Sequence, residues 1–123
     1  MESAKVESEY LNGILCFRVT GEIDHHSAVA AREQMDRDIW FFRPRTVILT
    51  LDGVDFMDSS GLGLILGRYT RVRDLQGNMK IEDPTPQIEK ILHLAGVDKL
   101  IPIVKNGKNK AYAPKIGEEV KTK

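Results

Sequence analysis

Short apolar runs alternate with stretches of helical periodicity along the chain. Residues 5–10 and 14–20 flank Asn12-Gly13, a strong signal for a β-hairpin. The continuous apolar run 46–51 predicts a strand that is covered on both faces. Residues 79–82 and 100–104 predict two more strands, and Pro102 places the last one at a sheet edge.

Three helices are predicted between these strands. Residues 27–39 carry apolar side chains at helical spacing, and residues 60–75 do so again, with Leu62, Ile65, Leu66, Tyr69 and Val72 on one face. A third helix is expected from Thr85 to about residue 94. The order predicts an α/β fold, with a mixed, mostly parallel sheet of about five strands, an opening antiparallel hairpin and helices packed on the sheet.

The length of 123 residues fits one domain. We expect the domain to span residues 1–104 and to be followed by a Lys-rich C-terminal extension, residues 105–123. The extension holds six lysines and two glutamates, together with glycines and a proline. This composition does not predict a helix and is typical of a solvated tail.

Composition excludes several classes of protein. Lys plus Arg and Asp plus Glu number 18 each, which argues against nucleic acid as a partner. The single Cys16 excludes an internal disulfide and a cysteine-based zinc site. The longest uncharged stretch, residues 59–67, is shorter than the ~20 apolar residues of a membrane span, and residues 1–7 lack the apolar core of a signal peptide. We therefore expect a cytoplasmic chain without a membrane partner.

Candidate chemistry gathers in residues 55–69, between the predicted buried strand and the second helix. Ligand sites of α/β folds collect at the carboxyl ends of parallel strands. Asp58, Ser59 or Ser60 can cap the helix by accepting from its first N–H groups. Glycines 61, 63 and 67 follow inside the helix, where each costs ~1 kcal/mol relative to alanine. Their presence indicates that another surface approaches the helix closely.

Residues 21–28 join a strand to a helix in the same way, so Asp24, His25 and His26 should lie near Ser59. Aspartate, histidine and serine are the residue types of a hydrolase triad, although no G-x-S-x-G motif surrounds Ser59. The glycine spacing G-x-G-x-x-x-G matches neither the dinucleotide fingerprint nor a P-loop. Adjacent histidines lack the i, i+4 spacing of a helical metal site, so we expect no metal.

Residues 21–26, 55–63 and 65–69 together resemble the anti-sigma factor antagonist family, whose fold is the STAS domain, and most closely its members in the sigma-F switch of sporulation. The resemblance implies a regulatory protein without catalysis or a cofactor of its own. The unphosphorylated form binds an anti-sigma factor that is also a serine kinase, and a sigma factor is thereby released. The kinase phosphorylates the serine after the motif aspartate, which is Ser59 here, and a metal-dependent PP2C-type serine phosphatase reverses this.

The physics of the segment agrees with such a switch. A phosphoserine carries about −1.5 to −2 charges and is tolerated at a helix start. In a closed interface beside Asp24 and Asp58 it is repelled, because two unit charges ~6 Å apart repel by about 3 kcal/mol at an effective dielectric of ~20. We expect Ser59 to take the phosphate in preference to Ser60, because Ser59 should point past the helix end into solvent.

The glycines leave a low helix surface, so we expect Leu64 to be partly exposed and to contact the partner together with Gly63, Gly67 and Arg68. The predicted partner-binding residues are Asp24, His25, Asp58, Ser60, Gly61, Gly63, Leu64, Gly67 and Arg68. Two alternatives stay open: a STAS module of another partner-switching or stress-response assembly, and a small serine hydrolase that uses Ser59. The free chain is expected to be a monomer.

Overall fold

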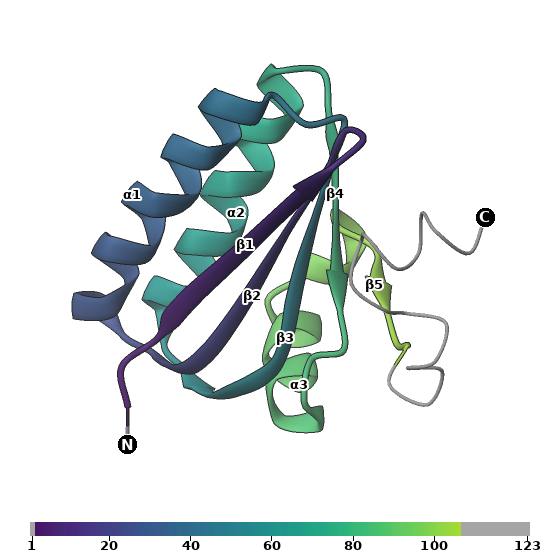
Figure 1. Ribbon diagram of the computed structural model, residues 1–123. Coiled ribbons are helices and arrows are strands. Elements are labelled where there is room, and N and C mark those ends of the chain that lie inside the picture. The colour runs from purple at the N-terminus through teal and green to yellow at the C-terminus, as the bar shows by residue number, and fades with distance from the viewer. Residues whose placement is uncertain (1, 107–123) are drawn as a thin grey trace.

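The computed structural model describes residues 2–106 (Figure 1). Its elements follow the predicted order, although the strand predicted at residues 46–51 is twice as long as predicted and the last strand is shorter than the predicted 100–104. They are β1 (Lys5–Leu11), β2 (Ile14–Ile23), α1 (His25–Phe42), β3 (Thr46–Met57), α2 (Ser59–Asp74), β4 (Asn78–Glu82), α3 (Pro86–Leu94), a 3-10 turn (Val97–Lys99) and β5 (Ile103–Val104).

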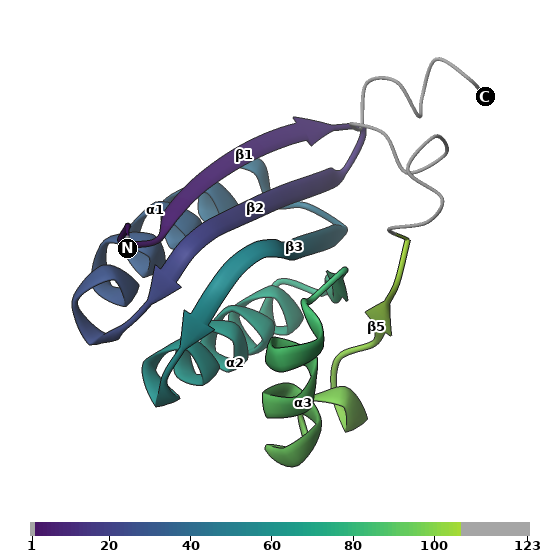
Figure 2. The same ribbon diagram turned by 90° about the horizontal axis from the view of Figure 1, so that it is seen from below.

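The five strands form one sheet in the order β1-β2-β3-β4-β5. β1 pairs with β2 in antiparallel fashion, and every other pair is parallel. The predicted α/β class, the opening hairpin and the edge position of the last strand are therefore confirmed. Figure 2 shows β1, β2 and β3 as neighbours in one curved layer.

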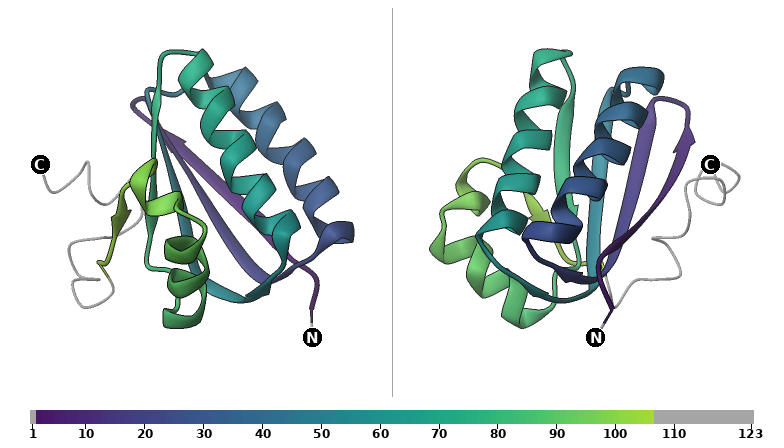
Figure 3. Two further views of the ribbon diagram at one scale, coloured as in Figure 1. Left: turned by 180° about the vertical axis from the view of Figure 1, so that it is seen from behind. Right: turned by 90° about the vertical axis from the view of Figure 1, so that its left-hand side faces the viewer.

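Helices α1 and α2 lie side by side on one face of this sheet, and α3 lies at its β4–β5 side (Figure 3). Both α1 and α2 run parallel to each other, because each follows a parallel strand. The hydrophobic core lies between these helices and the sheet. Among its fully buried side chains are Leu15, Phe17, Ile23, Met35, Ile39, Leu49, Leu51, Ile65, Ile81, Ile88 and Leu92.

The prediction that residues 46–51 are covered equally on both faces is wrong. Val47, Leu49 and Leu51 are buried, whereas Thr46, Ile48 and Thr50 between them are only half-buried. The two threonines tolerate this partial exposure, so a run of apolar and β-branched residues need not be a strand with two buried faces.

The two central strands are longer than their apolar runs predicted. β2 continues to Ile23 and β3 to Met57, and the two ends pair with each other across irregular registers. Gly21 makes one irregularity possible, because its φ of +97° suits glycine and an added Cβ would lie 2.8 Å from the carbonyl oxygen of Ser3. The extra length carries both strand ends to the same edge of the molecule.

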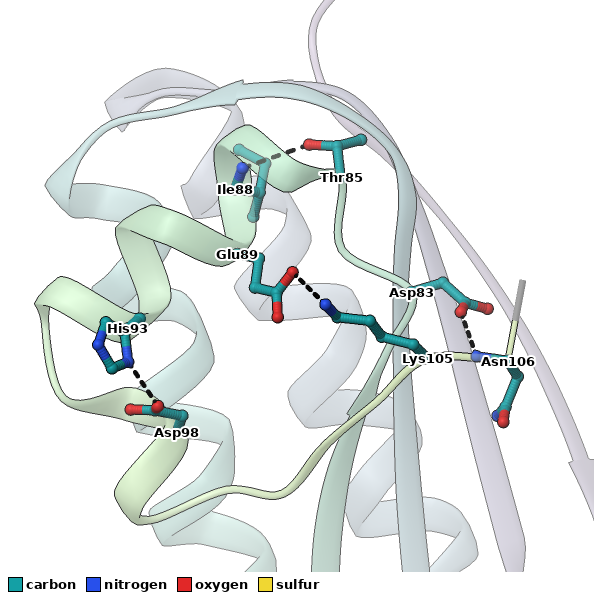
Figure 4. A network of polar contacts seen from close by, with 8 residues as sticks. All are labelled: Asp83, Thr85, Ile88, Glu89, His93, Asp98, Lys105 and Asn106. Atoms are coloured by element: carbon teal, nitrogen blue, oxygen red, sulfur yellow. Dashed lines mark hydrogen bonds and ion pairs between the residues drawn. The ribbon is translucent and has the colours of Figure 1, made fainter. Parts of the chain in front are cut away.

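A polar network connects α3 with the end of the described chain (Figure 4). Glu89 pairs with Lys105 at 2.8 Å, and the His93 Nδ1 atom lies 2.8 Å from Asp98. The backbone N–H of Asn106 donates to the carboxylate of Asp83. The start of the predicted extension is thereby attached to the domain, and the prediction for the rest of it lies outside the described residues.

Candidate functional site

Two strand-to-helix turns meet at one edge of the sheet, where β2 leads into α1 and β3 leads into α2. Ile23 pairs with Met57 in the sheet, and the backbone N–H of Asp58 donates to the carbonyl oxygen of Ile23 at 3.2 Å. The expected proximity of residues 21–28 to Ser59 is therefore confirmed. It follows from the adjacent, parallel arrangement of β2 and β3.

Asp24 caps α1 through a capping box. Its carboxylate accepts from the backbone N–H of Ser27 at 2.8 Å, and the Ser27 hydroxyl accepts from the backbone N–H of Asp24 at 3.1 Å. The backbone and side-chain hydrogen bonds from Ser27 hold the pKa of Asp24 below its usual value. Asp24 is therefore ionised at neutral pH and contributes negative charge to this edge.

Asp58 caps α2, and its carboxylate accepts from the backbone N–H of Ser60 at 2.8 Å. Of the three caps considered from the sequence, the structure selects Asp58. Ser59 is thus the first residue of the helix, one position further in than expected for a cap. Its side chain is nevertheless exposed, whereas Ser60 is half-buried. The contrast in exposure favours Ser59 as the residue that an outside enzyme can reach.

The three glycines of α2 have two different roles. A Cβ added to Gly61 would lie 2.7 Å from the Cβ and Sδ atoms of Met57, so this glycine allows the helix to pack closely on the end of β3. A Cβ added to Gly63 or Gly67 would meet nothing within 4 Å. These two glycines leave open space on the outer surface of α2, whereas Gly61 belongs to the packed interior.

The predicted partial exposure of Leu64 is wrong, because only 5% of Leu64 is exposed. Arg68, which was predicted to contact the partner, is also buried, with 6% exposed. Leu64 belongs to the hydrophobic core. The Nε atom of Arg68 lies 2.9 Å from Asp36 of α1. The buried stripe of α2 therefore runs through Gly61, Leu64, Ile65, Arg68 and Val72, and the predicted Leu62, Leu66 and Tyr69 are only half-buried.

The buried contact between Arg68 and Asp36 gives a prediction for stability. We expect Asp36→Ala to lower the free energy of unfolding by about 3 kcal/mol, because it leaves a buried guanidinium without its carboxylate. Asp38→Ala on the same helix removes only an exposed hydrogen bond with Ser8 and should cost about 1 kcal/mol or less. Urea unfolding of both variants measures the difference, and equal losses would contradict the prediction.

A pocket of about 280 Å³ lies between the first turns of α1 and α2. It is lined by His25, Ala28, Val29, Arg32, Ser60, Gly63 and Leu64. His25, Ser60, Gly63 and Leu64 were predicted from the sequence, whereas the α1 wall of Ala28, Val29 and Arg32 was missed. Its signal was the recurrence of residues 25, 28, 29 and 32 on one helical face, which overlaps the apolar stripe only at Ala28.

Both histidines of the first turn of α1 are exposed, and within residues 2–106 no hydrogen bond joins Ser59 to either of them. The same part of the chain holds no cluster of three or more potential metal ligands. No described helix has the length and apolar character needed to cross a membrane.

A family model described as the STAS domain matches residues 5–109. The chain belongs to the STAS domain family. Among curated proteins it is similar to an anti-sigma F factor antagonist from Paenibacillus polymyxa, with 39% identity over 105 residues that cover 85% of this chain and 90% of the relative. It is also similar to the protein of that name from Lysinibacillus sphaericus, at 35% identity over 65% of this chain and 68% of the relative.

A solved structure gives the same result for the fold. This STAS chain superimposes on the anti-sigma factor antagonist SpoIIAA in its unphosphorylated form with a TM-score of 0.71 and 27% identity. The match covers 80% of this chain and 87% of the other. The resemblance found in the sequence motifs is thereby confirmed at the level of the family and of the fold.

Proposed function

We propose that this chain is an anti-sigma F factor antagonist whose binding is switched off by phosphorylation of Ser59. The observation that carries the proposal is the exposed Ser59 at the start of α2, directly after the cap Asp58. The names of its relatives support the function, and the name of the similar structure distinguishes an unphosphorylated form of that protein.

In the proposed switch, the unphosphorylated chain binds an anti-sigma factor that is also a serine kinase, which frees a sigma factor. The interface comprises the two adjoining turns, with Asp24, His25, Asp58 and Ser60, and the open surface at Gly63 and Gly67. The chain acts in the bacterial cytoplasm, as a monomer when free. It contributes no catalysis and holds no cofactor, because the kinase supplies the ATP and a PP2C-type phosphatase removes the phosphate.

A phosphate on Ser59 changes the interface and leaves the fold intact. The first turn of α2 has free backbone N–H groups and a positive dipole end, so it tolerates added negative charge. Asp24 and Asp58 cap the neighbouring helix ends and are both acidic. In a closed interface the phosphate cannot be screened from these carboxylates by water, and binding is lost.

A reconstitution with three purified components tests this function. The chain, the anti-sigma F factor of the same organism and MgATP are incubated, and fragment mass spectrometry locates the phosphate. We expect one phosphate, on Ser59, and release of the chain from the anti-sigma factor once it is modified. Absence of a complex before ATP is added, or a phosphate elsewhere with Ser59 unmodified, would contradict the proposal.

Turnover of an acyl ester distinguishes the hydrolase alternative. We expect none above background, and Ser59 should still be phosphorylated in His25→Ala and His26→Ala. An esterase activity that is lost in Ser59→Ala would favour the hydrolase instead.

A further inference from the structure

Positive charge exceeds negative charge along the seam between α1 and α2. Asp36 of α1 binds two arginines of α2, with its Oδ1 atom 2.9 Å from the Nε atom of Arg68 and 3.0 Å from that of Arg71. Burial lowers the pKa of Arg68; Asp36 opposes this effect, and the nearby Arg71 and Arg32 add to it. Asp36 thus pairs with two of these arginines, and Arg32 is a third guanidinium group whose charge acts on Arg68.

Arg32 is the member of this cluster that is available to a partner. It is exposed, it lines the pocket beside Ser60, and within residues 2–106 its side chain makes no hydrogen bond or ion pair. Glu33 follows it directly but does not line the pocket, because successive helical residues point about 100° apart. Buried between the two helices, the Arg68 Nη1 atom also lacks a hydrogen-bond partner among the described residues.

The surface next to these arginines is open and partly apolar. Gly63 and Gly67 contribute no side chain to the surface of α2, and a Cβ at either position would have no neighbour within 4 Å. On the facing wall, Val29 is 38% exposed and Ala28 is half-buried. The pocket residues His25, Ala28, Val29 and Arg32 of α1 and Ser60 and Gly63 of α2 form one surface, and Gly67 and Arg71 follow Gly63 at i+4 and i+8 along α2. We call the pocket together with these two following residues the α1–α2 groove.

We propose that the α1–α2 groove binds an acidic segment of the anti-sigma factor, with an aspartate or glutamate against Arg32 and Arg71 and small or aliphatic side chains over the two glycines. The inference rests on the proposed function and specifies the chemistry of its partner. A protein carboxylate fits better than a nucleic acid phosphate, because the groove includes apolar side chains and the chain as a whole has no net positive charge.

An acidic occupant also makes the Ser59 switch more effective. The groove begins at Ser60, directly after the phosphorylated residue. A phosphate there faces the carboxylates of the bound segment as well as Asp24 and Asp58. Like charges brought together in an interface disfavour the complex without any change in fold.

Charge reversal at Arg32 tests the inference with a matched control on the same helix. In Arg32→Glu the affinity for the purified anti-sigma F factor should fall about tenfold or more, because an attraction becomes a repulsion. Arg37→Glu makes the same charge change about 140° away around α1 and should bind within about twofold of the parent. Binding is measured by calorimetry at several salt concentrations, and the salt dependence should decrease in Arg32→Glu only.

Arg32→Glu should not lower the stability of the fold. The substitution removes a positive charge that acts on the buried Arg68 and replaces it with a negative one. We expect an unchanged or higher melting temperature, so a loss of affinity cannot be attributed to unfolding. A lysine in place of the contacting acidic residue of the anti-sigma factor should restore binding to Arg32→Glu.

Each other outcome decides against the inference. If Arg32→Glu binds as tightly as the parent while phosphorylation of Ser59 still abolishes binding, the acidic occupant is wrong and the proposed function stands. If a DNA duplex binds the parent chain and this binding is lost only in Arg32→Glu, the groove binds nucleic acid instead. If the parent chain does not bind the anti-sigma factor at all, the proposed function and this inference fail together.

Discussion

Ser59→Ala is expected to abolish phosphorylation of the chain while preserving tight binding to the anti-sigma factor. Alanine removes the acceptor hydroxyl, but the cap of α2 remains, because Asp58 and not Ser59 accepts the hydrogen bond from Ser60. Phosphorylation of the parent should weaken binding about a hundredfold or more, since a repulsion of about 3 kcal/mol corresponds to roughly two factors of ten. Ser59→Asp adds a single charge and should weaken binding about tenfold.

Ser60→Ala is the matched control, because it removes a hydroxyl from the next position and leaves the backbone N–H that binds Asp58. It should still be phosphorylated. Kinase assays with labelled ATP measure phosphorylation of the parent and its three variants. Calorimetric titrations with the anti-sigma factor measure the binding of these proteins and of the phosphorylated parent. The assignment to Ser59 would be wrong if Ser59→Ala were labelled at the parental rate, or if labelling were lost in Ser60→Ala alone.

Much of the fold could be predicted from the sequence because its signals are local. Single elements are specified by local patterns: the Asn12-Gly13 turn, the apolar run 46–51, and the helical stripe of Ala31, Met35 and Ile39. The order of the elements then specifies a mostly parallel sheet. Strand ends were less predictable. β3 continues six residues beyond Leu51, past Asp52, Gly53 and Asp55, because its backbone continues to pair with β2 where the apolar run is interrupted.

The turns of the candidate site could be predicted from the sequence, but the face of α2 that is buried could not. The caps and the meeting of the two turns follow from residue types at strand ends. The burial of Arg68 does not, because its partner Asp36 is on another helix and the contact depends on how α1 and α2 pack. Because only apolar residues were counted, Leu62 and Leu66 were predicted to lie in the buried stripe of α2 and Leu64 was predicted to be exposed. Arg32 was missed for the same reason: the pocket that it lines is formed by residues of both helices and depends on how they pack.

The glycines of α2 provide a test that separates fold from binding. We expect Gly63→Leu to fold normally and to lose nearly all affinity for the anti-sigma factor. A side chain at this position enters open space, and leucine is a better helix former than glycine by up to about 1 kcal/mol. The same side chain fills the surface where the partner is proposed to lie, and an interface packed to protein density has no room for four additional carbon atoms.

Gly61→Leu, two residues earlier, should behave in the opposite way. Its Cβ would lie 2.7 Å from Met57, so we expect the free energy of unfolding to fall by about 1–3 kcal/mol as the helix is displaced from β3. Thermal unfolding and calorimetric binding on the two variants measure both quantities. If Gly63→Leu binds like the parent, the open side of α2 does not face the partner, and the interface is confined to the two turns around Asp24 and Ser59. If it unfolds as readily as Gly61→Leu, the two glycines do not have the separate roles that their surroundings indicate.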